Sequence, residues 1–221
     1  MKVAIVLGAT GLVGKKLVDR LVIEPCFEKV VAITRREVEY TSPKVVNEVI
    51  DFERIEQYLP LFSADVIFSC LGTTIKQAGT VAQQRKVDFT YQYQAAKLAA
   101  ENKVSHYILV SSYGANQESK SAYLKMKGEL ENAVSALTFK QISILQPSLL
   151  KGERESFRIG ETIGNAILPT LCKLPCLKKY RPISGDEVAS KMVSVSLSPR
   201  TGKQIYRLDE LFNIKCADEN F

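Results

Sequence analysis

A tyrosine and a lysine spaced four residues apart have the clearest potential for chemistry in this sequence. Tyr123 and Lys127 would share one face of a helix. An ammonium group beside a phenol stabilises the phenolate, so Tyr123 could transfer the proton that accompanies hydride transfer to or from a carbonyl. Ser112, which ends an earlier strand pattern, could orient that carbonyl or stabilise an oxyanion. We predict Ser112, Tyr123 and Lys127 as catalytic residues; the alternative is a surface Tyr/Lys pair without a catalytic role.

A glycine-rich turn near the start of the chain indicates dinucleotide binding. It lies between an apolar run at 3–7 and a helical pattern at 12–23, and its spacing is G-x-x-G-x-x-G. Glycine lets the backbone approach a pyrophosphate, and the free N–H groups at the start of the helix attract that anion. The predicted cofactor-binding residues here are Gly8, Ala9, Thr10, Gly11, Leu12, Val13 and Gly14. The alternative is a tight turn without a ligand.

The end of the second predicted strand favours NADP(H) over NAD(H). An NAD site usually places an acid at this point to hold the ribose hydroxyls. This strand ends in Ile33-Thr34-Arg35-Arg36 and carries no acid there. Arg35 and Arg36 could clamp a 2′-phosphate through charge-assisted hydrogen bonds. An exposed basic loop is the alternative.

Two further segments follow predicted strands at the edge where a cofactor crevice forms. Asp51 and Phe52 come after the third strand, where Asp51 could accept a hydrogen bond from an adenine or could cap the next helix; both interpretations stay open. Cys70, Leu71 and Gly72 end the fourth strand. Gly72 would allow close backbone approach, and Cys70 is expected to be a small packed residue rather than a nucleophile.

Apolar runs and helical patterns alternate along most of the chain. Strands are predicted at 3–7, 30–33, 45–50, 65–69, 107–110, 141–145 and 204–206. Helices are predicted at 12–23, 55–59 (stopped by Pro60), 80–102, 123–137, 157–172 and 188–197, the last opened by a capping box at 184–187. This order predicts an α/β fold, a Rossmann-like doubly wound parallel sheet with a small C-terminal substrate region. We expect one domain over 1–221, with the substrate side mainly in 151–221.

Composition narrows the classes of partner. The chain has 221 residues, 46% of them hydrophobic, and a net charge of +6 whose lysines and arginines are scattered among 24 acids. We therefore expect no nucleic-acid partner. Five cysteines without a disulfide or zinc spacing suggest reduced thiols and no metal site. With no signal peptide or membrane span expected, we predict a cytoplasmic monomer or homodimer.

Taken together, these motifs resemble the atypical short-chain dehydrogenase/reductases over 3–195. Within that group the sequence is most similar to the oxidoreductase-like Tat-interacting protein family and its bacterial and fungal relatives. The strings that carry the resemblance are Leu7-Gly-Ala-Thr-Gly-Leu-Val-Gly14, Val49-Ile-Asp-Phe-Glu53, Cys70-Leu-Gly-Thr-Thr74, Val110-Ser-Ser-Tyr-Gly-Ala115 and Tyr123-Leu-Lys-Met-Lys-Gly-Glu129.

The resemblance implies an NADPH-binding Rossmann fold. It places the dinucleotide on 8–14, Arg35, Arg36, Leu71, Gly72, Tyr123 and Lys127, and points to Leu150 and Arg158 for the nicotinamide half. The family often has Arg-Pro-Gly at the end of the sixth strand, where this chain has Gln146-Pro147-Ser148. That departure leaves the shape of the substrate pocket open.

Two functions are consistent with these residues. The first is an NADPH-dependent oxidoreductase that transfers a hydride to or from a small carbonyl or alcohol substrate. The alternative is an NADPH-binding regulatory (redox-sensing) interaction protein without turnover. Only the enzyme needs Ser112, Tyr123 and Lys127 as a working set, so their presence together favours the enzyme.

Overall fold

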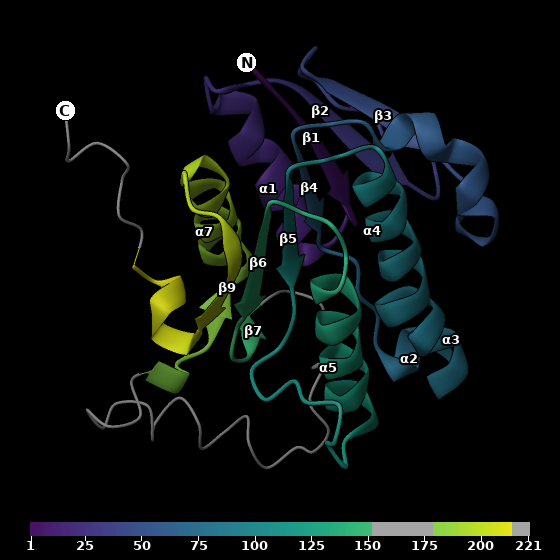
Figure 1. The fold of residues 1–221 in the computed structure, drawn as a ribbon, viewed down its shortest axis with the longest axis vertical. Coiled ribbons are helices and arrows are strands. Elements are labelled where there is room, and N and C mark those ends of the chain that lie inside the picture. The colour runs from purple at the N-terminus through teal and green to yellow at the C-terminus, as the bar shows by residue number, and fades with distance from the viewer. Residues whose placement is uncertain (152–178, 214–221) are drawn as a thin grey trace.

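A parallel β-sheet forms the centre of the protein. The computed structural model describes residues 1–151 and 179–213 (Figure 1). Seven strands pair in the order β3-β2-β1-β4-β5-β6-β9, and every neighbouring pair is parallel. Their bounds are β1 Lys2–Leu7, β2 Phe27–Thr34, β3 Val45–Val49, β4 Val66–Ser69, β5 His106–Val110, β6 Gln141–Gln146 and β9 Gly202–Arg207. The predicted Rossmann-like doubly wound sheet is confirmed.

Helices cover both faces of the sheet, because the central strands carry apolar side chains on both sides. On one face, α1 (Leu12–Ile23) packs with α7 (Gly185–Leu197) over Ala4 and Val6. On the other face, η1 (Phe52–Phe62), α4 (Tyr91–Glu101) and α5 (Ala122–Ser135) pack over Ile5 and Leu7. Figure 1 shows α4 and α5 on the side of the sheet opposite α7.

The contact between α1 and α7 joins segments far apart in the sequence. Arg20 on α1 donates two hydrogen bonds to the Asp186 carboxylate, at 3.0 and 2.7 Å. A Cβ on Gly185 would lie 2.5 Å from the Leu12 carbonyl oxygen, so only glycine fits at the start of α7. The capping box predicted at this start is present, with Ser184 and Glu187 each bonding the other's backbone N–H. The start of α7 thus contacts α1 both at its first turn, through Leu12, and near its end, through Arg20.

The long helix predicted over 80–102 is interrupted in the structure. It consists of α3 (Val81–Arg85), a π-helical turn over Lys86–Thr90, and α4. The extra residue in the π-turn points Asp88 inward, where its side chain is inaccessible to solvent. Such turns in helices often accompany functional sites.

Other boundaries also differ from the prediction. A short helix, α2 (Ile75–Ala78), follows β4 where none was expected. Pro60 lies inside η1, but Tyr58 has non-helical backbone angles, so Pro60 falls in the first turn after a kink, where its missing N–H costs no hydrogen bond. Two short strands, β7 (Leu150–Lys151) and β8 (Ile183–Ser184), pair with each other. The helix predicted at 157–172 lies outside the described residues.

Candidate cofactor site

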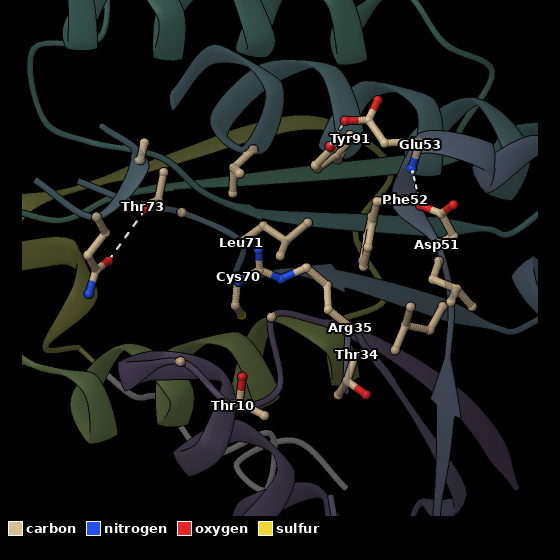
Figure 2. A pocket seen from close by; sticks show the side chains of 18 of the residues that line it. Thr10, Thr34, Arg35, Asp51, Phe52, Glu53, Cys70, Leu71, Thr73 and Tyr91 are labelled. Atoms are coloured by element: carbon tan, nitrogen blue, oxygen red, sulfur yellow. Dashed lines mark hydrogen bonds between the residues drawn. The ribbon is translucent and has the colours of Figure 1, made fainter. Parts of the chain in front are cut away.

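A cavity of about 1330 Å³ opens at the carboxyl ends of β1, β2 and β4. This is the edge at which parallel α/β sheets bind ligands. The cavity brings together residues that the sequence placed in four separate segments: Gly8, Thr10, Gly11, Arg35, Asp51, Phe52, Cys70, Leu71 and Gly72. Figure 2 shows their side chains converging from β2, the start of η1 and the end of β4.

The glycine turn combines two packing constraints with one open position. Gly8 has φ +75°, and a Cβ there would lie 2.7 Å from the Cys70 carbonyl oxygen. A Cβ on Gly14 would lie 2.1 Å from the Gly8 carbonyl oxygen, so the helix and the turn require glycine at both ends. Gly11 has ordinary backbone angles and lines the cavity, where its added Cβ would meet the Gly8 oxygen at 3.1 Å. At Gly8 and Gly14 a side chain would overlap the backbone, whereas at Gly11 the space that a side chain would fill belongs mainly to the cavity.

The start of α1 offers unpaired backbone donors to an anion. Gly11 is the N-cap of α1 and provides no side-chain hydrogen bond, and the first turn of the helix contains no acid. Free N–H groups and the positive end of the helix dipole attract a phosphate at this position. Ala9, Leu12, Val13 and Gly14 complete the turn but do not line the cavity; Ala9 and Val13 pack in the core.

Aromatic and apolar side chains form the wall near η1. The rings of Phe52 and Tyr91 lie with centroids 5.3 Å apart, and Ile33 and Leu71 line the same cavity. Sequence reasoning missed Tyr91, because nothing in the linear pattern reveals that α4 reaches this edge. Apolar and aromatic side chains of this kind can contact a purine ring.

Two carboxylates in the cavity have hydrogen-bond donors of their own. Glu53 accepts hydrogen bonds of 2.7 Å from Lys86 and from the Tyr91 hydroxyl. These bonds, that from Lys86 foremost, hold the pKa of Glu53 below its usual range. Burial and the bond to Glu53 raise the pKa of Tyr91 to about 12. Asp51 accepts a 2.9 Å bond from the Glu53 N–H, so it caps η1 and lines the cavity at once.

Only one of the two predicted arginines reaches the cavity. Arg35 lines it, and Figure 2 shows its side chain pointing toward Cys70 and Leu71. Arg36 is exposed and does not line the cavity. Its carbonyl accepts a 2.7 Å hydrogen bond from Thr34, which turns the chain away at the end of β2. Of the predicted pair, Arg35 is the arginine that lines the cavity.

The predicted catalytic residues lie outside the cavity lining. The spacing argument places Tyr123 and Lys127 on one face of α5, and the Lys127 nitrogen lies 6.0 Å from the centre of the Tyr123 ring. Lys127 is 1% exposed and forms an ion pair of 3.3 Å with Asp88, which is 0% exposed. Ser112 donates a 3.4 Å hydrogen bond to the Tyr113 carbonyl. None of the three contributes to the cavity wall.

Asp88 connects this lysine to the end of β4. Its second carboxylate oxygen accepts a 2.8 Å hydrogen bond from the Thr73 N–H, and Thr73 lines the cavity. The backbone carbonyl of Asp88 accepts a 2.9 Å bond from Gln92, whose side-chain oxygen accepts from Ser69. The π-turn thus holds α5, α4 and the segment after β4 together. The signal available in the sequence was a pair of polar residues, Asp88 and Gln92, on the inward face of a predicted helix.

The remaining predicted residues have structural surroundings. Desolvation raises the pKa of the Cys70 thiol to about 12, and its sulfur lies 3.8 Å from that of Met192. This agrees with a packed residue rather than a nucleophile. Leu150 packs against the core beside α7 and does not line the cavity. Arg158 lies outside the described residues.

The described part of the chain contains neither a metal-binding cluster nor a membrane-spanning helix. Within 1–151 and 179–213, no three His, Cys, Asp or Glu side chains are arranged to hold a metal ion. No helix within the same ranges is both long and apolar enough to cross a bilayer.

Comparison with known proteins gives consistent matches. The family model described as NAD(P)H-binding matches residues 8–163. Protein HTATIP2 from Rattus norvegicus is 37% identical over 174 residues, covering 77% of this chain and 72% of that relative. The protein FMP52, mitochondrial, from Saccharomyces cerevisiae is 36% identical over 203 residues, covering 88% of this chain and 87% of the relative.

Solved structures share the fold at low identity. MoeE5 in complex with UDP-glucuronic acid and NAD has a TM-score of 0.67 at 13% identity and covers 94% of this chain and 76% of its own. UDP-glucose 4-epimerase from Thermotoga maritima, solved with UDP-glucose, has a TM-score of 0.64 at 15% identity and covers 95% and 80%. Both results bear on the fold alone.

The fungal relatives correct one expectation. Those from Saccharomyces cerevisiae, Eremothecium gossypii and Scheffersomyces stipitis are all named as mitochondrial. This contradicts the cytoplasmic location predicted from the sequence, which rested on the lack of a recognisable signal and on the number and spacing of the cysteines.

The family itself follows from the extent of these matches. The NAD(P)H-binding model covers more than half of the chain, and the two relatives exceed 30% identity over most of their own length. The cavity supplies what such a family requires, a glycine turn at the start of a helix at the carboxyl edge of the sheet. The chain belongs to the NAD(P)H-binding family, as a relative of the atypical short-chain dehydrogenase/reductases.

Proposed function

We propose that this protein is an NADPH-dependent oxidoreductase that acts on a small carbonyl or alcohol. The observation that carries the proposal is that one cavity joins the open glycine turn, the aromatic side chains of Phe52 and Tyr91, and Arg35. The diphosphate would lie over Gly11 and the start of α1, and the adenine would lie against Phe52 and Tyr91. When bound, the cofactor supplies the hydride.

Arg35 supports NADP(H) as the cofactor. Arg35 lies at the end of β2 and points into the cavity. In NAD-binding proteins this position usually holds an acid, which binds the hydroxyl groups of the unphosphorylated ribose. Arg35 forms no ion pair among the described residues, so its guanidinium is available to a 2′-phosphate. Asp51 and Glu53 are already hydrogen-bonded by protein donors.

Arg36 provides a matched control for this assignment. Calorimetry with NADPH and NADH should show a preference for NADPH in the wild type. Arg35→Ala should lower NADPH affinity by about 10- to 100-fold, because a hydrogen bond to a charged group contributes about 1.5–3 kcal/mol. Arg36→Ala removes the same charge one residue away and should leave the preference intact. Equal affinity of the wild type for both dinucleotides would refute the NADPH assignment.

In the proposed chemistry, Tyr123 donates or accepts the proton at the substrate oxygen and Ser112 orients that oxygen. Lys127 supplies the positive charge beside Tyr123, and Asp88 holds Lys127 in place. The test is NADPH oxidation across a panel of aldehydes, ketones and quinones. Tyr123→Phe should retain NADPH binding and lose turnover, because the ring remains and only the hydroxyl is removed. A Tyr123→Phe variant as fast as the wild type would exclude Tyr123 as the acid.

One observation favours a second candidate, an NADPH-binding regulatory protein without turnover. Ser112, Tyr123 and Lys127 all lie outside the cavity lining, whereas the adenosine end is open. A protein that only senses the dinucleotide needs the open end alone. Tight NADPH binding by the wild type with no turnover of any compound in the panel, together with an NADPH-dependent change in a partner interaction, would favour this second function over the first.

A further inference from the structure

A second cation, Lys76, lines the cavity in addition to Arg35. Among the described residues, the only lysine or arginine side chains in the lining are Arg35, at the end of β2, and Lys76, on α2. Neither forms an ion pair with a described carboxylate. The two acids in the lining, Asp51 and Glu53, already accept hydrogen bonds from the protein. The cavity lining therefore carries two cations on two separate elements, neither of which is held by an ion pair with a described residue.

The backbone beneath Lys76 is fixed. The Thr74 side chain caps α2 by accepting a 3.2 Å hydrogen bond from the Gln77 N–H. Gly79, with φ +83°, ends the helix and bonds the Ile75 carbonyl at 2.8 Å. One residue before the cap, the Thr73 N–H is tied to the buried Asp88 carboxylate. Lys76 is exposed, so its side chain is a free cation on an anchored support.

The position of α2 along the cavity identifies what this cation would meet. The backbone of Cys70 touches the glycine turn, as the 2.7 Å approach of a Gly8 Cβ to its oxygen shows. Thr73 and α2 follow directly along the chain. Figure 2 shows Thr73 on the far side of Cys70 from Asp51 and Glu53, with Thr10 below Cys70. Lys76 therefore belongs to the end where the diphosphate lies in the proposed cofactor pose.

A diphosphate bridge carries a charge on each phosphate, whereas a helix start offers roughly half an elementary charge. Lys76 would add a full positive charge to that half charge, so that most of the diphosphate charge is balanced. We propose that Lys76 binds the diphosphate of the cofactor from the side facing away from the glycine turn. The cavity thereby separates two anion positions, the 2′-phosphate at Arg35 and the diphosphate at Lys76. This inference rests on the proposed dinucleotide site.

Fragments of the cofactor separate the two positions. ADP-ribose carries the diphosphate and no 2′-phosphate, whereas 2′-AMP carries the 2′-phosphate and no diphosphate. Calorimetry on the full chain should show Lys76→Ala weakening NADPH and ADP-ribose by about tenfold, with 2′-AMP within about twofold of wild type. Arg35→Ala should weaken NADPH and 2′-AMP, with ADP-ribose within about twofold of wild type. Lys76→Arg should restore most of the affinity, because the charge returns.

Lys97→Ala is the matched control, since Lys97 is an exposed lysine on α4 outside the cavity and its loss lowers the net charge equally. If Lys76→Ala binds NADPH as tightly as Lys97→Ala does, the inference is overturned while the proposed function stands. Equal weakening of 2′-AMP and ADP-ribose by Lys76→Ala would also overturn it, because Lys76 would then affect both anion positions rather than the diphosphate position alone. A wild type that binds none of the three compounds refutes the cofactor site itself.

Discussion

The glycine turn permits a sharp test, because the same added methyl group has different consequences at Gly8 and Gly11. At Gly8, alanine must adopt a φ of +75° and place its Cβ within 2.7–2.9 Å of three backbone atoms of the β4 end. The left-handed conformation costs about 1–2 kcal/mol, and overlap with backbone costs about 1–3 kcal/mol. We expect Gly8→Ala to lower the free energy of unfolding by about 3 kcal/mol.

At Gly11 the backbone angles are ordinary, and the nearest atom to an added Cβ is the Gly8 oxygen at 3.1 Å. The fold should lose about 1 kcal/mol, mainly because alanine is a poor N-cap. For a chain of this size, about 2–4 °C of melting temperature corresponds to 1 kcal/mol. Differential scanning calorimetry should therefore show a drop of about 6–12 °C for Gly8→Ala and about 2–4 °C for Gly11→Ala.

Gly79→Ala isolates the backbone strain, since Gly79 has φ +83° and no atom within 4 Å of an added Cβ. Its destabilisation should lie between those of the other two variants. Isothermal calorimetry completes the test: Gly11→Ala, although folded, should lose most of its NADPH affinity, because the methyl group occupies the diphosphate position. The reasoning is refuted if Gly8→Ala melts no lower than Gly79→Ala, or if Gly11→Ala binds NADPH like the wild type.

Three further predictions concern buried groups. Desolvation lowers the pKa of His106 from 6.5 to about 4. Below pH 6.5 the unfolded chain therefore binds a proton at this histidine that the folded chain does not bind. Urea titrations should show the free energy of unfolding falling by up to about 3 kcal/mol by pH 4. Cys70, its pKa raised to about 12, should resist iodoacetamide at pH 8 while exposed Cys26 reacts, as peptide mass mapping would show. Lys127→Ala should destabilise the fold by about 3–5 kcal/mol, because it leaves a buried carboxylate unpaired, and Lys125→Ala on the exposed face of α5 should change stability little.

The strands and the glycine turn were predictable because their signals are local. An apolar run such as Val3–Leu7 is buried on both sides wherever the sheet is covered by helices, so its composition alone reveals it. The capping box at Ser184–Glu187 is also local, since both partners lie within one turn. These elements appear in the structure close to their predicted positions.

The interruption in the helix predicted over 80–102 was not predictable from periodicity. A π-turn adds one residue without changing the residue types that favour a helix. Its cause is tertiary, namely the pairing of Asp88 with Lys127 and with the Thr73 N–H across three segments. For the same reason, Tyr91 and Lys76 were missed at the cavity: each reaches it only through the placement of a whole helix.

The prediction of an arginine pair shows a different limit. Sequence adjacency suggested that Arg35 and Arg36 act together, but both follow Thr34, the last residue of β2, so the alternation of side chains along a strand does not govern them. Arg35 lines the cavity and Arg36 does not, and this difference is set by the path of the chain after the strand, which no local pattern in the sequence reveals.

The packing of α7 on α1 has a consequence for synthesis of the protein on the ribosome. The glycine turn and α1 emerge early, but the apolar face of α1 is covered by Val188, Ala189 and Met192 of α7, which are translated more than 160 residues later. Until then the nascent chain exposes that face together with unpaired strands, a condition that favours aggregation and chaperone binding. The cofactor site is thus encoded first and stabilised last, and a chain truncated before α7 would present an incomplete nucleotide site to the cell's quality control.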